Sequence, residues 1–174
     1  FANDVFGGAI PHQFISSVEK GVLDALEAGT LSGAPIQDVR VVVTDGKAHS
    51  VDSKDIAFRT AAKLAFRDAF SRARPVLLEP IVNLEITVPE AHTGTVTGDL
   101  KNMRGKVMGF DSLADAITVV HAQAPLAEIG NYVGQLRGAT SGQGSFTMEL
   151  AHYDAAPAAV PQRITAAYKP HAEE

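Results

Sequence analysis

The first half of the chain combines two helical patterns with one strand-like run. After Phe14, apolar residues recur every three or four positions as far as Gly29, which is typical of an amphipathic helix that ends at a glycine. Residues 36–44, IQDVRVVVT, are rich in β-branched side chains and predict a strand. Asp45 and Gly46 follow and predict a turn, because glycine adopts positive φ without steric cost.

A second helix is expected after this turn. Asp52 and Asp55 have the spacing of a capping box, with Asp in place of the usual Glu. The segment from Arg72 to Pro75 provides a stop, because cations favour a helix C-terminus and proline cannot continue the helix. We expect the inner face to carry the apolar residues at helical spacing, which are Ile56, Phe58, Ala62, Ala65, Phe66 and Ala69.

The second half has its patterns in the order β-α-β-β-α-β, which is typical of a ferredoxin-like domain. The predicted elements are a strand at 81–88, a helix at 94–103, strands at 106–110 and 116–123, a helix from 125 and a strand at 145–152. Asp111, Ser112 and Asp115 would form the turn between the two middle strands. We therefore predict an α+β protein with two domains, residues 1–78 and 79–174, whose tail after Ala155 is at most a short amphipathic helix.

Composition narrows the class of protein. With 174 residues, of which 45% are hydrophobic and 20% charged, the chain can bury a core and is not disordered. No apolar run approaches the roughly 18 residues of a membrane helix. The absence of cysteine excludes a disulfide scaffold and suits a reducing compartment, so we expect a cytoplasmic protein. The chain begins with Phe1 and has no leader, which indicates a piece of a longer protein.

The sequence holds no recognisable catalytic or metal-binding motif. It lacks the GxxxxGK[ST] phosphate loop, and Ser141 and Ser145 have no surrounding GxSxG nucleophile motif. The six histidines include no HExxH pair, so their spacing does not support a metal site. The net charge of −5 also argues against a basic nucleic-acid module. We predict no catalytic residue, no cofactor and no metal in this chain.

Two features are candidates for binding. The first is a polar loop between the predicted strand and the second helix, in which Lys47 could meet a phosphate and His49 could stack on a base or donate to RNA oxygens. A solvated turn would have the same composition. The loop consists of Asp45, Gly46, Lys47, Ala48, His49 and Ser50.

The second candidate is a row of cations on the second predicted helix. Arg59, Lys63 and Arg67 follow one another at four-residue steps and would form a stripe that faces phosphates. Asp55 precedes Arg59 by four residues, and Asp68 precedes Arg72 by four, so a solvated face with helix ion pairs is an equal alternative.

Three strings of residues carry a resemblance to a known family. The first half contains GGAIP, which begins at Gly7, and DGKAHSVDS from Asp45 to Ser53; it is similar to the fourth domain of bacterial elongation factor G. The second half contains LLEP, GDL at Gly98 to Leu100, PLAE and GQGSF, and it resembles the fifth domain. Together these strings place about residues 1–165 in register with the family.

The resemblance implies a fold and a task. The first domain would be a ribosomal protein S5 domain-2-like βαβ domain without its first strands, and the second would be ferredoxin-like. The longer protein would be a translational GTPase that moves mRNA and tRNA through the ribosome, with GTP and Mg in a domain outside this chain.

His49 and its loop would enter the decoding site. The partners would be the 16S and 23S rRNA and the mRNA–tRNA in the A site. Lys101 and Arg104 would join Arg59, Lys63 and Arg67 as RNA phosphate contacts.

The chain departs from the family pattern at several contacts. KAHS at the loop lacks the usual aromatic residue before its histidine, Met103 replaces one arginine of a usual pair, and Gln143 stands where a basic residue is common. These changes favour a divergent paralogue. A ribosome-protection or ribosome-recycling factor is the alternative, and a free-standing RNA-binding module is a further one. We also expect the isolated chain to bind ribosomes weakly and in a salt-sensitive way.

Overall fold

The computed structural model describes residues 1–30, 32–160 and 164 and separates the chain into two compact units. Unit 1 includes Phe1–Pro75, and unit 2 is Val76–Pro157. The change from one unit to the other lies slightly before the boundary at 78/79 that the sequence indicated. Each unit has its own layers and its own apolar core, as expected of an α+β protein with two domains.

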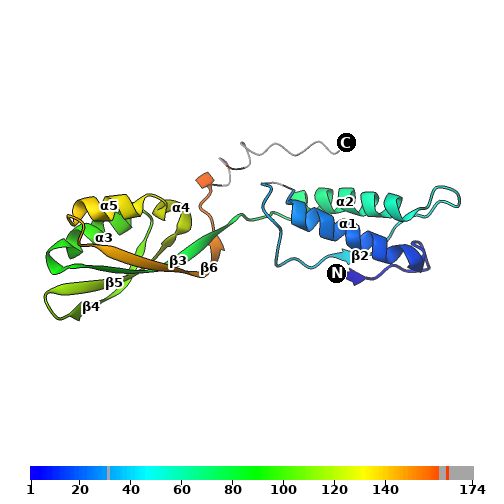
Figure 1. The fold of residues 1–174 in the computed structure, drawn as a ribbon. Helices are drawn as coiled ribbons and strands as arrows, with labels where there is room; N and C mark the ends of the chain where they lie inside the picture. Colours follow the sequence, from blue (N-terminus) through cyan, green and yellow to red (C-terminus); the bar gives the residue numbers. More distant parts are fainter. Residues whose placement is uncertain (31, 161–163, 165–174) are drawn as a thin grey trace. The chain divides into compact units, whose positions relative to one another are not determined.

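Unit 1 is built from two short strands and two helices. β1 (Ala2–Asn3) pairs in parallel with β2 (Val42–Val43), and α1 (Ile15–Ala28), preceded by the 3-10 turn η1 (His12–Phe14), connects them. α2 (Asp55–Arg72) follows β2. This is the predicted βαβ arrangement, followed by a second helix (Figure 1).

The two helices of unit 1 run in the same direction. Near their starts, Phe14 stacks on Phe58 with the ring centroids 4.6 Å apart. Further along, Phe66 packs against Val22 and Ala25. Because both contacts advance together along the two helices, the segments that lead into α1 and α2 lie at the same end of the unit, as Figure 1 shows.

The buried stripe of α2 is narrower than the sequence indicated. Phe58 and Phe66 are buried, and Ala62 and Phe70 are half-buried, at steps of four residues. The prediction that Ile56, Ala65 and Ala69 face inward is wrong, because all three are exposed. The physical reason is that α2 packs mainly on α1, and one neighbouring helix covers less of its surface than a sheet would.

The predicted strand at 36–44 is also wrong in length. Only Val42–Val43 form a strand, since β1 provides only two residues of pairing, with Ala2 N donating to Val41 O and Asp4 N to Val43 O at 2.8 Å. Asp38 has φ +58°, which interrupts an extended run. β-branched residues alone do not make a strand where no partner extends beside them.

The predicted local signals before α2 are wrong as well. The turn lies at residues 50–52 and not at Asp45–Gly46. The N-cap residue is Lys54 and makes no side-chain capping bond, so the capping box does not form. Asp55 instead accepts a 2.7 Å hydrogen bond from Ser17 Oγ of α1, which takes the carboxylate away from its own helix end.

Unit 2 is a four-stranded antiparallel sheet with helices on one face. Its strands are β3 (Leu78–Pro89), β4 (Lys106–Leu113), β5 (Ile117–Pro125) and β6 (Ser145–Ala155), in the spatial order β4-β5-β3-β6. The helical segments are η2 (Glu90–His92), α3 (Thr93–Asn102), α4 (Leu126–Ile129) and α5 (Tyr132–Ala139). The order and the strand arrangement confirm the ferredoxin-like prediction (Figure 1).

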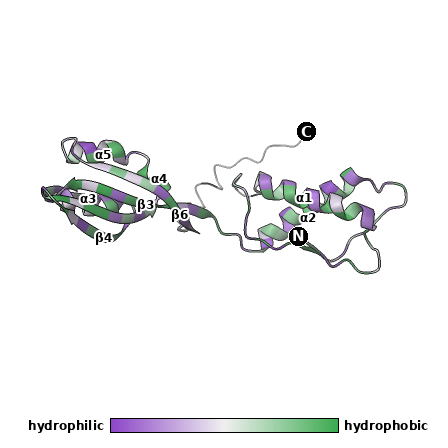
Figure 2. Ribbon diagram, turned by 60° about the horizontal axis from the view of Figure 1, so that its bottom comes forward, coloured by the Kyte–Doolittle hydropathy of each residue, from purple (hydrophilic) through white to green (hydrophobic). Residues whose placement is uncertain are grey.

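Alternation along the central strands produces the core of unit 2. Alternate residues of β3 and β5 are buried beneath α3 and α5, and the others lie on the open face of the sheet, which explains the banded hydropathy of these strands (Figure 2). The buried set is Val82, Leu84, Ile86, Val88, Val96, Leu100, Met103, Val120, Ala122, Ala124, Ile129, Tyr132 and Leu136.

Three details of unit 2 differ from the sequence prediction. Asp111 and Ser112 continue β4, and the turn lies around Asp115 and Ala116, which both have positive φ. The single helix expected after Pro125 is two short helices, α4 and α5. The expected helical tail falls largely outside the described residues. In the described part of the chain, no helix has the length and apolar character needed to cross a membrane.

Candidate functional site

The loop from Asp45 to Ser50, here called the tip loop, connects β2 to α2 at the end of unit 1 where both helices begin. Its polar side chains Asp45, Lys47, His49 and Ser50 are exposed. Ala48 is half-buried and packs against the cluster that contains Ile10, Phe14, Val18 and Phe58. One apolar residue therefore anchors the loop, and the residues on either side of it are presented to solvent.

Hydrogen bonds hold the second half of the tip loop in a closed turn. The His49 amide N–H donates to Ser53 Oγ at 2.8 Å, and the Ser53 amide N–H donates to His49 O at 3.3 Å. His49 Nδ1 lies 3.4 Å from Asp52 Oδ2. With Nδ1 next to this carboxylate, Nε2 is the ring nitrogen left for an external partner.

In the first half of the loop, the backbone of Gly46 lies close to the side chain of Ile10. A Cβ atom on Gly46 would lie 2.5 Å from Ile10 Cδ1 and Cγ1, so a larger residue here would require the Ile10 side chain to shift. Gly46 does not have the positive φ that the sequence interpretation assumed. The contact also ties the tip loop to the segment that leads into α1.

The charge around the tip loop is mixed. Asp45 and Asp52 lie close in sequence to Lys47, and all three side chains are exposed. The starts of α1 and α2 lie at the same end, where the helix dipoles add partial positive charge. Such a surface attracts phosphates only moderately and is better suited to short-range hydrogen bonds and stacking.

The predicted cationic stripe on α2 takes part in helix pairing. Arg59 binds Asp24 of α1 with two hydrogen bonds, Nε to Oδ2 at 2.5 Å and Nη2 to Oδ1 at 2.7 Å. This guanidinium holds the pKa of Asp24 below its usual value, opposed by desolvation and assisted by the charge of Lys63. The predicted Asp55–Arg59 pair does not form, whereas the predicted Arg72–Asp68 pair does, at 2.8 Å. Phosphate contacts by Arg59, Lys63 and Arg67 stay predictions.

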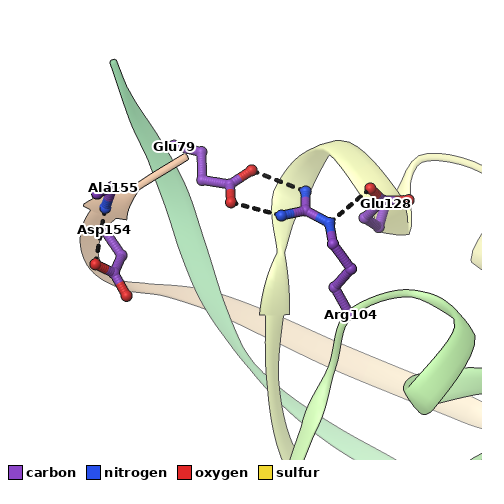
Figure 3. A network of polar contacts seen from close by, with 5 residues as sticks. All are labelled: Glu79, Arg104, Glu128, Asp154 and Ala155. Carbon is purple, nitrogen blue, oxygen red and sulfur yellow. Dashed lines mark hydrogen bonds and ion pairs between the residues drawn. The ribbon is translucent and has the colours of Figure 1, made fainter. Parts of the chain in front are cut away.

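Arg104 connects three elements of unit 2 (Figure 3). Its Nη1 and Nη2 donate to Glu79 of β3 at 2.7 and 2.9 Å, and its Nε donates to Glu128 of α4 at 3.0 Å. The hydrogen bond to Glu79 is the main cause that raises the pKa of the guanidinium far above its usual value, against the effect of burial. Arg104 also has φ +56°, so its partners hold an uncommon backbone conformation.

These contacts define what Arg104 can do for RNA binding. Its fork geometry is already used by the carboxylate of Glu79, which is buried and has no other hydrogen-bond partner within the part of the chain that the structure describes. A phosphate would have to compete with two carboxylates for this side chain. Lys101, in the last turn of α3, is exposed, and its contact with phosphate stays a prediction.

Sequence reasoning missed a polar network on the open face of the unit 2 sheet. His121 Nε2 lies 2.9 Å from Asp111 Oδ2, and its Nδ1 lies 3.7 Å from Glu85 Oε1. Beside it, Gln123 donates to Asn83 Oδ1 at 2.9 Å. Only the strand register brings these residues together, because they are scattered along the sequence. Within the described ranges, no cluster of three His, Asp or Glu residues is arranged to hold a metal ion.

Comparisons with known proteins agree with the two units. Residues 1–74 match the family model "Elongation factor G, domain IV", and residues 76–164 match "Elongation factor G C-terminus". The chain belongs to the elongation factor G family. Unit 1 therefore corresponds to domain IV of elongation factor G, and unit 2 to its C-terminal domain.

Two relatives show how far the similarity extends. The chain is 49% identical over 164 residues to elongation factor G of Aquifex pyrophilus, a match that covers 94% of this chain and 23% of that protein. A crystal structure of a Thermus thermophilus protein superposes with a TM-score of 0.78 at 39% identity, over 94% of this chain and 25% of the other. The chain thus spans about a quarter of the length of these relatives.

Proposed function

We propose that this chain is the ribosome-contacting part of a longer translational GTPase, and that its tip loop enters the decoding site while mRNA and tRNA move through the ribosome. The observation that supports this proposal best is the exposed, internally hydrogen-bonded tip loop of domain IV. A loop fixed by its own contacts loses little conformational freedom on binding, which favours its use as a preformed contact.

The chain would act by shape and contact, without chemistry of its own. GTP and Mg would bind in a domain outside this chain, in the cytoplasm, and hydrolysis there would drive the movement. Lys47 would contact a phosphate, and His49 Nε2 would contact an RNA oxygen, while Asp52 keeps the imidazole oriented through Nδ1. Domain IV would meet the 16S rRNA and the mRNA–tRNA, and the C-terminal domain would meet the 23S rRNA.

A free-standing RNA-binding module that uses the sheet of unit 2 is not supported. The open face of that sheet carries the carboxylates of Glu85, Asp111 and Glu149. These charges repel phosphates, and the inner strand β5 offers no Phe, Tyr or Trp on which a base could stack. Its one histidine, His121, lies between the carboxylates of Asp111 and Glu85. The tip loop is therefore the better candidate for RNA contact.

The proposed role of His49 is tested by replacing it with alanine in the full-length protein. We expect the single-turnover rate of translocation to fall roughly ten- to 150-fold, as for the loss of one hydrogen bond to a charged group. His152→Ala, at an exposed histidine of β6, is the matched control and should leave the rate unchanged. An unchanged rate for His49→Ala would remove the proposed role of the tip loop histidine.

A further inference from the structure

Phe6 is unusually exposed for a large aromatic residue. The residue is 93% exposed, more than any other large apolar residue that the structure describes. Single apolar residues are common on protein surfaces, but most keep part of their side chain against a neighbour. Phe6 therefore contributes almost no packing to unit 1. The stability of unit 1 does not explain why an aromatic residue is present at this position.

The backbone around Phe6 keeps the side chain away from the core. Val5, just before it, packs against the cluster that includes Ile10 and Ala48. Gly7 and Gly8, just after it, have φ +66° and +73°, and a Cβ on either would meet nothing within 4 Å. The segment is thus held by Val5 before Phe6 and is free of neighbouring atoms at the two glycines after it. Because glycine has no side chain, a flat partner can come close to the backbone there.

Phe6 lies at the same end of unit 1 as the tip loop. Val5 and Ala48 pack against the same cluster, and Ile10 of that cluster lies so near Gly46 of the tip loop that a Cβ there would be 2.5 Å from it. The parallel helices place the segment before α1 and the loop before α2 side by side, as Figure 1 shows. Phe6 is therefore a neighbour of the loop that carries Lys47 and His49.

We propose that Phe6 stacks on an unpaired nucleobase of ribosome-bound RNA, next to the contacts made by the tip loop. This inference rests on the proposed function and adds a specific contact to it. The nearby exposed charges include Asp4, Asp45 and Asp52 beside Lys47, so phosphate attraction at this end is modest. An exposed aromatic ring supplies affinity that does not depend on charge, and any of the four bases can stack on it.

The test uses the complete 174-residue chain and vacant bacterial 70S ribosomes. The chain has no tryptophan, so Phe6→Trp introduces a single fluorophore at the proposed contact. Its fluorescence should be quenched when ribosomes bind. Dissociation constants are then measured for the wild type and for Phe6→Trp, Phe6→Leu and Phe6→Ala. Phe110→Leu, at a half-exposed aromatic residue of β4, is the matched control.

Stacking predicts a specific order of affinities. Phe6→Trp should bind as tightly as the wild type, whereas Phe6→Leu and Phe6→Ala should both bind roughly five- to a hundredfold more weakly. The loss should be the same at low and high salt, because stacking is not screened. Wild-type affinity for Phe6→Leu with weak binding of Phe6→Ala would show apolar packing on protein and overturn the inference, as would wild-type affinity for both.

A second variant separates this inference from the proposed function. His49→Ala in the same chain should weaken ribosome binding if the tip loop makes its contact. If His49→Ala weakens binding and Phe6→Leu does not, the proposed function stands and the stacking inference fails. If the wild-type chain shows no binding, or if neither substitution has an effect, both fail.

Discussion

At the scale of single residues, Tyr132 has an environment that its sequence position does not reveal. Its ring is fully buried in the core of unit 2, 5.4 Å from the ring of Phe146. Its hydroxyl has no hydrogen-bond partner among the described residues. Burial, with a smaller contribution from the charge of Asp99, raises the pKa of Tyr132 to about 12. A buried hydroxyl without a partner costs stability.

This environment predicts how stability depends on pH. Because the pKa of Tyr132 is higher in the folded state than the usual value of 10, the unfolded chain loses this proton first. The free energy of unfolding is therefore unaffected by this group below pH 10. As the pH rises from 10 through 12, the ionisation of Tyr132 lowers the free energy of unfolding by about 2–3 kcal/mol. This pH dependence is measured by urea unfolding of the wild type and of Tyr132→Phe, at neutral pH and at about pH 11.

The variant should differ from the wild type in two ways. At neutral pH, Tyr132→Phe should be as stable as the wild type or more stable by about 1 kcal/mol, since it removes an unpaired hydroxyl. Between pH 10 and 12, it should lose less stability than the wild type does. A variant that is less stable at neutral pH, or that has the same pH dependence, would contradict this description of the site.

At the scale of elements, the packing of α1 on α2 depends on one glycine. A Cβ atom on Gly21 would lie 2.1 Å from the carbonyl oxygen of Arg59 and 3.1 Å from Ala62 Cβ. Backbone atoms cannot move aside as a side-chain end can. The backbones of the two helices therefore lie close together at this point, and the Asp24–Arg59 pair joins them nearby.

This close approach predicts opposite effects for the same substitution at two helical glycines. Gly21→Ala should lower the free energy of unfolding by about 1–3 kcal/mol, because the added methyl group forces the helices apart. Gly98→Ala, in α3 with nothing within 4 Å of its Cβ, should raise it by about 0.5–1 kcal/mol, because alanine favours helix. Thermal or urea unfolding of both variants measures these two changes in stability. A Gly21→Ala variant as stable as the wild type would contradict the close packing of α1 on α2 at Gly21.

The elements that sequence patterns predict well are those whose neighbours cover one whole face. β3 and β5 alternate cleanly because helices cover one side of the sheet, and their predicted positions are confirmed. β2 is much shorter than predicted because its partner β1 has two residues. The partners of Asp55 and Arg104 lie 38 and 25 residues away in sequence, so no local motif could reveal them.

At the scale of the whole molecule, the family assignment depends on motifs spread over both units, and the comparisons confirm it. The geometry of the site was less accessible from sequence. The sequence indicated a polar loop between a strand and a helix, and Lys47 and His49 are exposed in it. It did not reveal the closed turn between His49 and Ser53, which depends on the local path of the backbone. It also did not reveal Phe6 beside the loop, because that placement depends on how distant segments pack together in unit 1.

The central claim is that the tip loop reaches the decoding site of the small subunit. Ser50 is exposed in the tip loop, and this chain contains no cysteine, so Ser50→Cys in a cysteine-free full-length protein can carry a hydroxyl-radical source. Ser71→Cys, exposed near the far end of α2, is the matched control. On ribosomes, we predict cleavage of 16S rRNA at the decoding site from position 50 and not from position 71. Absence of decoding-site cleavage from position 50, or equal cleavage from both positions, would contradict the claim.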